Sequence, residues 1–330
     1  MSQKREVIIF AELSDGRLHR SALELCALGR RLANELSGIA SAILIGKDSQ
    51  KLAPELISYG MDRVYVSEDA VFHQYQPEAY TGLIEQVCRR EGPEILLFGQ
   101  TLQGRDLAPR LAFRLKAGLA TDGVEFAIDS DSKALIVIRP TYGAKALATV
   151  TFSSKPGIAT VRSKAVSPAA KEEGRKGEMI PLDVKIDPKA LRIKYIERLK
   201  QEAEGPKLED AEVIVSGGRG LGGAENFALL QELAKLLGGV VGGSRIAIDN
   251  GWLPSSRQVG LTGTIVSPRL YFAVGISGAT QHMAGCGSSR YIVAINTDAN
   301  APIFRRAHYG VVADYKPVIT AMIQCCKEGS

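Results

Sequence analysis

Short apolar runs alternate with helical patterns through the first third of the chain. The strand-type runs are Val7–Phe10, Ile39–Ile45, Val64–Val66 and Ile95–Phe98, and one of the intervening helices covers Tyr80–Arg90. Strand, helix and strand at this rhythm are typical of βαβ units. The pattern therefore predicts an α/β fold with a parallel sheet covered by helices.

The first helix is expected to begin at Ser21. Glu24 follows three residues later, which is the spacing of a capping box. Leucines then recur at helical spacing from Leu25 to Leu36, and Gly38 stands where the helix would end.

From about Lys133 the pattern changes. Ala134–Ile138, Ala146–Thr151 and Ile158–Val161 are β-rich runs with no room for helices between them, and we expect them to form an antiparallel extension of the first sheet. The stretch 168–212 is rich in Lys, Glu, Pro and Asp and is interpreted mostly as a connector. We therefore expect an N-terminal α/β domain over residues 1–190, a linker over 191–210 and a second domain over 211–330.

A glycine-rich loop follows the strand-type run Val213–Val215. Gly218, Gly220 and Gly223 match G-x-G-x-x-G between a strand and a helix. Such a loop turns tightly and directs backbone amides at an anionic phosphate, and Arg219 adds a cation. Taken alone, the same match also fits a surface turn.

The helix after this loop is expected over Ala224–Leu237. Three later strands each end in glycine or in a hydrogen-bonding side chain: Leu270–Val274 ends in Gly275 and Ser277, Ile292–Ile295 ends in Asn296 and Asp298, and Val311–Ala313 ends in Asp314. Because ligands bind along the carboxyl edge of open parallel sheets, these ends predict a dinucleotide-sized site.

Composition narrows the class of protein. Hydrophobic residues make up 45% and charged residues 23% of the 330 residues, which is typical of a folded globular chain. The formal charge of +5 is dispersed, so no nucleic-acid partner is expected. The five cysteines form no C-x-x-C pair, which argues against a metal site. No apolar run reaches the roughly 18 residues of a membrane span, and we expect a soluble, cytoplasmic protein without membrane insertion.

The second half carries a series of specific motifs. In order they are Gly218-Arg219-Gly220, Glu225-Asn226-Phe227, Gly243-Ser244-Arg245, Gln258-Val259-Gly260-Leu261-Thr262-Gly263, Gly275-Ile276-Ser277-Gly278-Ala279, Gln281-His282, Ile295-Asn296, Ala301-Pro302-Ile303-Phe304 and Asp314. The first half adds Gly104-Arg105-Asp106-Leu107-Ala108-Pro109-Arg110-Leu111-Ala112 and Ala159-Thr160-Val161-Arg162. Together these motifs closely resemble the FAD-binding α subunit of electron-transfer flavoproteins.

The resemblance implies two Rossmann-like, doubly wound domains. The first would be nucleotide-hydrolase-like and contact a β subunit, and the second would hold FAD. The implied cofactor-binding residues are Arg219, Ser244, Arg245, Gln258, Val259, Gly260, Leu261, Thr262, Ser277, Gly278, Ala279, Thr280, Gln281, His282, Asn296, Asp314 and Tyr315. No catalytic or metal-binding residue is implied.

Within that set, Arg245, Thr262 and His282 would lie nearest the isoalloxazine. The arginine and the histidine would stabilise an anionic semiquinone, and Thr262 would hydrogen-bond N5. The turn 277–280 would offer amides to the pyrophosphate, while Asp314 and Asn296 would suit the ribose and the adenine.

Other interpretations of these residues stay open. Arg245 could cap a helix or pair with Asp249, and His282 could be an interior histidine. Arg105, Asp106 and Arg110 at helical spacing favour subunit contact over chemistry. Leu261 stands where mitochondrial members often have glutamine, which suggests an altered potential, and the C-terminus (322–330) also departs from the family.

The resemblance further implies the function. The chain would be part of a heterodimer that accepts electrons from flavoprotein dehydrogenases such as the acyl-CoA dehydrogenases of fatty acid β-oxidation. It would pass them through a stabilised semiquinone to ETF-quinone oxidoreductase or ferredoxin, as a carrier rather than a small-substrate enzyme. The alternative within the family is a bifurcating protein that couples NADH oxidation to ferredoxin and enoyl-CoA reduction. The alternatives outside it are an NAD-binding dehydrogenase domain and a sensory nucleotide-binding subunit.

Overall fold

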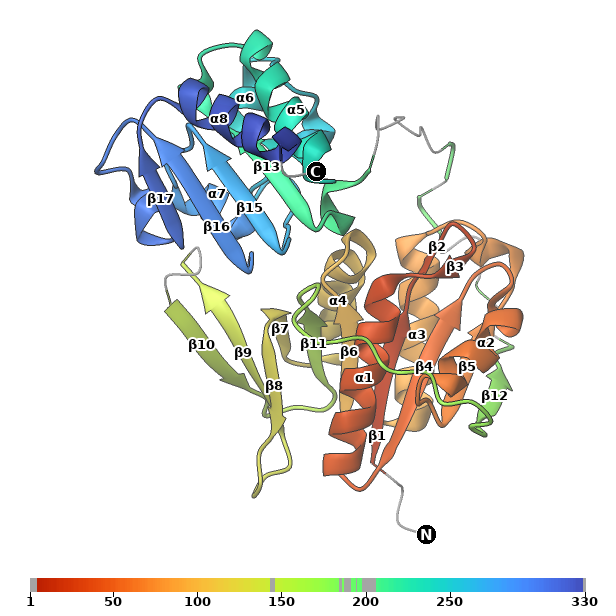
Figure 1. The fold of residues 1–330 in the computed structure, drawn as a ribbon. Helices are drawn as coiled ribbons and strands as arrows, with labels where there is room; N and C mark the ends of the chain where they lie inside the picture. Colours follow the sequence, from red (N-terminus) through yellow and green to blue (C-terminus); the bar gives the residue numbers. More distant parts are fainter. Residues whose placement is uncertain are drawn as a thin grey trace. The chain divides into compact units, whose positions relative to one another are not determined.

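The computed structural model describes residues 5–142, 146–183, 186, 191–193, 195–197 and 206–328. Contacts divide the chain into two compact units, Met1–Arg198 and Leu199–Ser330 (Figure 1). Much of the linker predicted over 191–210, namely 194 and 198–205, lies outside the described residues. Among the helices of the described segments, none is long and apolar enough to cross a membrane.

Unit 1 is built on a seven-stranded sheet in which every neighbouring pair is parallel. Its order is β12-β5-β4-β1-β6-β11-β7. The strands are β1 (Glu6–Ala11), β4 (Ile39–Ile45), β5 (Arg63–Ser67), β6 (Ile95–Gly99), β7 (Leu119–Gly123), β11 (Gly157–Val161) and β12 (Glu178–Pro181). The helices are α1 (Arg20–Glu35), α2 (Ser49–Ser58), α3 (Pro77–Glu91) and α4 (Leu102–Leu115), and β2 (Leu13–Ser14) and β3 (Arg17–Leu18) form a small hairpin. The expected parallel sheet is confirmed.

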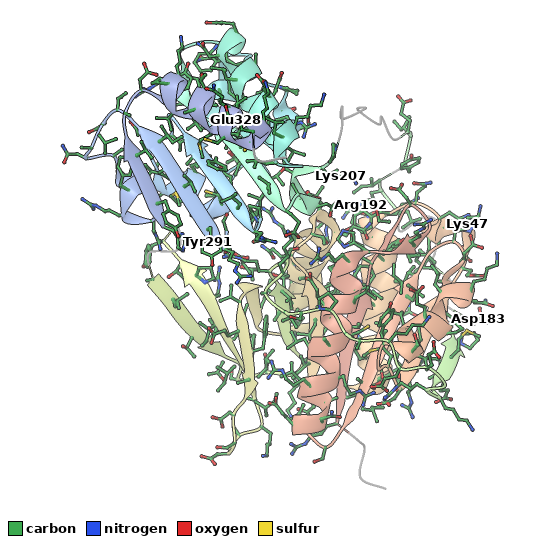
Figure 2. All side chains as sticks on the ribbon, viewed as in Figure 1. Lys47, Asp183, Arg192, Lys207, Tyr291 and Glu328 are labelled. Carbon is green, nitrogen blue, oxygen red and sulfur yellow. The ribbon has the colours of Figure 1, made fainter. Side chains whose placement is uncertain are left out.

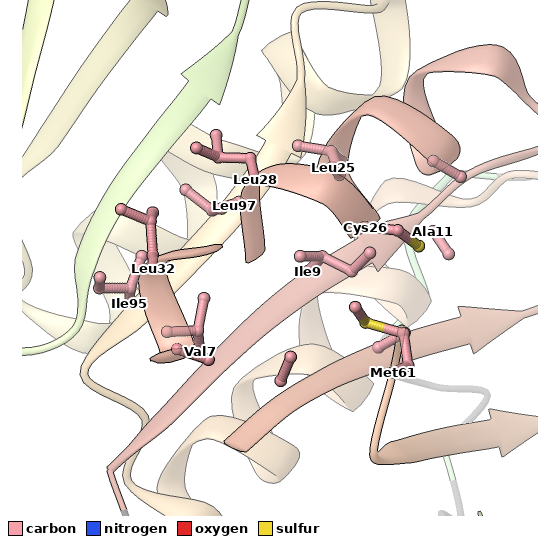
Figure 3. Packing of buried hydrophobic residues seen from close by; sticks show 14 of the residues in the cluster. Val7, Ile9, Ala11, Leu25, Cys26, Leu28, Leu32, Met61, Ile95 and Leu97 are labelled. Carbon is pink, nitrogen blue, oxygen red and sulfur yellow. The ribbon is translucent and has the colours of Figure 1, made fainter. Parts of the chain in front are cut away.

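Alternate residues of the central strand bury into different helix layers, as the two-residue period of a strand dictates. Val7 and Ile9 pack in one cluster with Leu25 and Leu28 of α1 (Figure 3). Residues 8 and 10 pack in a second cluster with α3 and α4. The sheet is therefore covered on both faces.

The predicted capping box at Ser21 is wrong. α1 begins at Arg20, and its N-cap is His19, whose Nδ1 accepts from the Ser21 amide at 3.2 Å. Glu24 is bound elsewhere, since its carboxylate accepts from the side chain of Arg20 and from the amide of Lys164. The His19 imidazole thus accepts from the Ser21 amide, which is the donor that the Glu24 carboxylate would bind in a capping box.

The predicted antiparallel extension needs a correction. β8 (Glu125–Ile128), β9 (Leu135–Thr141) and β10 (Ala146–Thr151) form a separate antiparallel sheet. The third predicted run, β11, instead lies inside the main sheet and pairs in parallel with β6 and β7. All its residues are buried, which is typical of a central parallel strand.

The stretch interpreted as a connector contains a strand. β12 pairs in parallel with β5 at the edge of the main sheet. Its sequence, Glu178–Pro181, is short and largely exposed, so it lacks the apolar run by which β1, β4, β5 and β6 were identified.

Unit 2 is a five-stranded parallel sheet with the order β14-β13-β15-β16-β17. The strands are β13 (Val213–Gly217), β14 (Val240–Gly243), β15 (Leu270–Val274), β16 (Tyr291–Asn296) and β17 (Tyr309–Val312). The helices are α5 (Phe227–Leu236), α6 (Arg245–Asp249), α7 (Thr280–Cys286) and α8 (Tyr315–Glu328). Figure 2 marks Tyr291 at the start of β16 and Glu328 at the end of α8.

Two helix layers enclose the sheet of unit 2. α5, α6 and α8 share one hydrophobic cluster with Val215, Phe272 and Val274. α7 shares the other with Ile214 and Tyr271. The doubly wound arrangement expected for the second domain is confirmed, although its first long helix begins at Phe227 after a 3-10 turn, Ala224–Asn226, and not at Ala224.

Candidate functional site

A cavity of about 660 Å³ lies at the carboxyl ends of the strands of unit 2. Its walls come from residues that follow β13, β14, β15 and β16. The chain leaves β13 for β14 on one side and returns to β15 on the other, and such a switch point is where open parallel sheets bind ligands. The volume lies within the roughly 300–1,000 Å³ that is common for cofactor sites.

Most of the predicted cofactor-binding residues line this cavity. They are Arg219, Ser244, Arg245, Gln258, Val259, Gly260, Leu261, Thr262, Ser277, Ala279, Gln281, His282 and Asn296. Gly278, Thr280, Asp314 and Tyr315 are outside the lining set. The structure therefore brings together five separate segments. Three of them follow strands whose ends already predicted one site, and the segments 244–246 and 258–262 were grouped with them only by the resemblance.

The residues outside the lining set have clear structural surroundings. Gly278 has φ +83°, and a Cβ there would lie 2.4 Å from the Ile303 amide nitrogen. The Tyr315 hydroxyl donates to the Leu221 carbonyl at 3.1 Å. Asp314 is exposed and accepts from the Lys316 amide at 2.8 Å, so it sits at the start of α8 as a cap.

The phosphate role predicted for the loop Gly218–Gly223 is wrong for its first glycines. The Gly218 amide donates to the Val274 carbonyl at 2.9 Å, and the Gly220 amide donates to the Gly275 carbonyl at 3.0 Å. Both donors are therefore used within the protein. These glycines serve close packing of the β13 loop on the β15 loop, since a Cβ at Gly220 would lie 2.8 Å from the Gly275 Cα.

Free amides occur instead in the turn that follows β15. The turn is fixed by the Ser277 carbonyl, which accepts from the Ile303 amide at 2.9 Å. The amides from Ser277 to Gln281 have no hydrogen-bond acceptor within the segments that the structure describes. Unpaired donors beside a cavity favour an anionic ligand group.

Two guanidinium groups add positive charge to the cavity wall. Arg219 is exposed at its rim. Arg245 opens α6 and pairs with Asp249 at 3.3 Å, with side chains that are 68% and 59% exposed. The alternative interpretation of Arg245 as an ion-pair residue is thus confirmed, yet the same side chain also lines the cavity. An exposed pair of this kind is weak, so it leaves the cation available to a ligand.

Two buried polar atoms at the cavity lack protein partners. The Ser244 Oγ and the His282 Nδ1 have no hydrogen-bond partner in the described part of the chain. Burial of a polar atom without a partner costs about 1–3 kcal/mol, and a bound ligand group would remove that cost. These two atoms are the structural evidence that the cavity is shaped for a polar cofactor.

His282 is an interior histidine as well as a cavity residue. It is 7% exposed, and its Nε2 lies 2.9 Å from the Tyr271 hydroxyl. Burial lowers the pKa of His282 to about 4, because an apolar environment disfavours the charged imidazolium. The ring is therefore neutral at physiological pH.

The segment 258–264 forms one wall and is held by its own hydrogen bonds. The Gln258 side chain donates to the Thr262 hydroxyl at 2.9 Å. The Leu261 amide donates to the Gln281 carbonyl at 2.8 Å, which ties this wall to the start of α7. The Leu261 side chain is 54% exposed and adds an apolar surface to this wall.

Asn296 lines the cavity but uses its side chain within the protein. Its Nδ2 donates to the Ile276 carbonyl and its Oδ1 accepts from the Asp298 amide, each at 3.0 Å. It therefore fixes the β15 and β16 loops against each other, in addition to any contact with a ligand.

Several lining residues were missing from the predicted set. They are Gly220, Ile246, Gly275, Ile276, Asp298, Ala301 and Pro302. Asp298 had a signal in the sequence, since it closes a strand-type run beside Asn296. Ile246 gave no such signal, because an isoleucine at the start of a short helix is usually interpreted as a residue of the hydrophobic core. Within the described segments, no group of three or more metal-ligating side chains occurs.

Comparisons with known proteins settle the family. The family model "Electron transfer flavoprotein domain" matches residues 7–187, and the model "Electron transfer flavoprotein FAD-binding domain" matches residues 207–287. The chain belongs to the electron transfer flavoprotein α-subunit family.

Full-length relatives agree with this assignment. The chain is 41% identical over 329 residues to the electron transfer flavoprotein subunit alpha of Thermoanaerobacterium thermosaccharolyticum, covering 99% of both chains. It is 38% identical to the subunits alpha of Megasphaera elsdenii and Bacillus subtilis, covering 98% of each relative. FAD is the cofactor of the matched domain, so the interpretation as an NAD-binding dehydrogenase domain has no support.

Proposed function

We propose that the cavity of unit 2 holds the FAD of a heterodimeric electron carrier in which this chain is the α subunit. The carrier accepts electrons from flavoprotein dehydrogenases, among them acyl-CoA dehydrogenases, and passes them to a quinone-reducing oxidoreductase or to ferredoxin. The main support is the presence in one cavity of two arginines, a turn of free amides and two unpaired polar atoms. Bound FAD would supply the ability to carry electrons singly or in pairs.

Each part of the cavity has a separate task in this proposal. The amides of Ser277 to Gln281 and the guanidinium of Arg219 bind the pyrophosphate. The Arg245 guanidinium, which lines the cavity, would hold the ring system and stabilise negative charge there. Thr262 would hydrogen-bond the flavin N5, and its hydroxyl accepts from the Gln258 side chain at 2.9 Å, which orients it.

His282 contributes as a neutral group. An imidazole with a pKa of about 4 adds no positive charge at neutral pH, so it acts on the flavin by hydrogen bonding. Ser244 supplies a hydroxyl whose oxygen is already buried without a partner in the described part of the chain. A hydrogen bond from this hydroxyl to the cofactor therefore needs little further desolvation of the oxygen. Charge stabilisation and hydrogen bonding are thereby divided between different side chains.

The β subunit is expected to contact unit 1. On α4, Asp106 accepts from the Tyr75 hydroxyl at 2.7 Å and from the Arg110 side chain at 2.8 Å. Leu102 and Phe113 of the same helix are each 86% exposed, and large apolar side chains in that state are typical of subunit interfaces. The cytoplasm is the expected location.

The proposal is tested by the content of nucleotides in the purified heterodimer. The chain is co-expressed with its β subunit, and acid-released FAD and AMP are quantified together. One FAD with one AMP supports the simple carrier. Two FADs without AMP would replace it with the bifurcating alternative, for which NADH and ferredoxin are then assayed. No FAD, even after reconstitution, would contradict the proposal.

A further inference from the structure

Tyr271 is a buried polar residue next to the cavity that the proposed function does not use. It is the second residue of β15 and has no exposed surface. Its hydroxyl lies 2.9 Å from the His282 Nε2, and the two ring centroids are 6.1 Å apart. The parallel register places it between Ile214 and Ile292 of the neighbouring strands, so the phenol is fixed in the core.

The state of both groups follows from their burial. Burial raises the pKa of Tyr271 well above its usual range, so the phenol keeps its proton. Burial lowers the pKa of His282 to about 4, so the imidazole carries only one N–H. One hydrogen is therefore shared between the Tyr271 oxygen and Nε2, and it comes either from the phenol or from the ring.

The surroundings of the ring favour the phenol as the donor. If Tyr271 donates to Nε2, the single ring proton lies on Nδ1. The Val259 backbone acts as a hydrogen-bond acceptor that raises the pKa of His282. Because Tyr271 already occupies the Nε2 side, this acceptor lies on the Nδ1 side. The contact falls short of regular hydrogen-bond geometry, since Nδ1 has no such partner among the described residues. Nδ1 is then a buried donor that a ligand can use.

We propose that Tyr271 is a positioning residue that fixes the plane and the tautomer of His282. By donating its hydroxyl hydrogen to Nε2, it keeps the ring proton on Nδ1 and offers that donor to the flavin. A histidine held this way stabilises added negative charge on the flavin without being charged itself. The part of this proposal that concerns the flavin rests on the proposed function, whereas the tautomer is a property of the chain alone.

The tautomer is measured first, by nitrogen NMR of the histidine-labelled heterodimer. The chain has four histidines, and His282→Asn identifies the resonances of interest by their loss. We expect a protonated Nδ1 and an unprotonated, hydrogen-bonded Nε2. A protonated Nε2 would overturn the proposal. The measurement needs no activity and is made with and without FAD, so it stands even where FAD binding fails.

Tyr271→Phe tests the consequence for the flavin. It removes one oxygen and keeps the ring that packs in the core. We expect unchanged FAD content, a mixture of His282 tautomers and a fall of about tenfold in the formation constant of the one-electron-reduced flavin, equal to about 59 mV between the two one-electron potentials. Unchanged tautomer and potentials would contradict the proposal.

Tyr80→Phe is the matched control. The Tyr80 hydroxyl is also buried and donates to a backbone carbonyl, that of Phe72, at 3.0 Å, but it lies in unit 1. It should leave the His282 resonances and the potentials unchanged. If Tyr271→Phe does not fold, the wild-type tautomer alone decides. Absence of FAD from the wild-type heterodimer would count against the proposed function and not against the tautomer.

Discussion

Gly218 and Gly275 approach so closely that a Cβ atom on Gly218 would lie 2.3 Å from the Gly275 carbonyl oxygen. The first follows β13 and the second follows β15, so the contact joins the two strands at whose switch point the cavity lies. The Gly218 amide also donates to the Val274 carbonyl. The close approach requires residues without side chains at this crossing, and the hydrogen bond holds the two loops at that distance.

Gly218→Ala is accordingly expected to destabilise unit 2 by about 3 kcal/mol, since the methyl group meets backbone that cannot move aside. FAD binding should be lost with it. The control is Gly222→Ala in the same loop, where φ is +82° and nothing lies within 4 Å of the added Cβ. It should cost only about 1–2 kcal/mol for the left-handed backbone. Urea unfolding followed by fluorescence measures both, because Trp252 is the only tryptophan and lies in unit 2. If the two variants lose the same free energy of unfolding, the close approach of Gly218 to Gly275 does not cause the destabilisation.

Ser244→Ala should separate stability from cofactor affinity. The Ser244 Oγ is buried and unpaired, so its removal should leave the FAD-free chain equally stable or up to about 1 kcal/mol more stable. The same change should weaken FAD binding by about tenfold, which is about 1.4 kcal/mol. Flavin titration of the apoprotein and urea unfolding give the two values. A loss in both would indicate a structural role for the hydroxyl.

Arg245→Ala should alter the flavin and not the fold. The ion pair with Asp249 is mostly exposed, and such pairs contribute little, so the free energy of unfolding should change by less than about 0.5 kcal/mol. The yield of one-electron-reduced flavin on reductive titration should fall, because the charge beside the cavity is gone. Asp249→Asn breaks the same ion pair but keeps the cation, and its yield should match or exceed the wild-type value. An unchanged yield in Arg245→Ala would remove the proposed role.

Leu261→Gln should raise the potential of the bound flavin. Leu261 is 54% exposed at the cavity, so a side chain of similar length is accepted at little cost in stability. An amide donor there can stabilise the reduced, more negative flavin, and each tenfold gain corresponds to about 59 mV for one electron. Leu261→Met keeps the apolar character and serves as the control. The potential is measured by spectroelectrochemistry, and equal values for the two variants would exclude an amide contact.

The sequence predicted strands better than helices, for a physical reason. Strands such as Ile39–Ile45 and Leu270–Val274 are continuous apolar runs because both of their faces are covered. α2, Ser49–Ser58, was missed because Pro54 lies inside it, and proline in a helix interior argues against a helix. β12 was missed because an exposed edge strand needs no apolar run.

The sequence predicted that the site lies at the ends of several strands, but it did not predict the order of those strands across the sheet. A sequence indicates that parallel strands end at one edge of the sheet, and it does not indicate which strands are neighbours. β17 lies at the outer edge of the order β14-β13-β15-β16-β17, so Asp314 after it lies outside the cavity that forms around β13 and β15. The G-x-G-x-x-G match correctly indicated a tight turn after β13. The amides of its first two glycines donate to carbonyls at the end of β15 and in the loop after it, and this contact between distant segments could not be predicted from the sequence.

Unit 2 should lose stability in acid through His282. The pKa of His282 is about 4 in the folded chain against 6.5 for a free histidine, so between these values the unfolded chain binds the additional proton. The free energy of unfolding is therefore unaffected by this histidine above about pH 6.5. It falls by about 3 kcal/mol as the pH decreases to about 4, because protonation favours the unfolded chain. The measurement is urea unfolding of the FAD-free chain at pH 7, 6, 5 and 4, followed by the fluorescence of Trp252. Carboxyl groups with raised pKa values also make stability depend on pH, but Glu6, Glu12 and Glu24 lie in unit 1. The fluorescence of Trp252 follows the unfolding of unit 2, where His282 lies. His282→Gln is the control, and its stability should change less with pH over that range. If both chains show the same pH dependence, burial of His282 is not what shifts its titration.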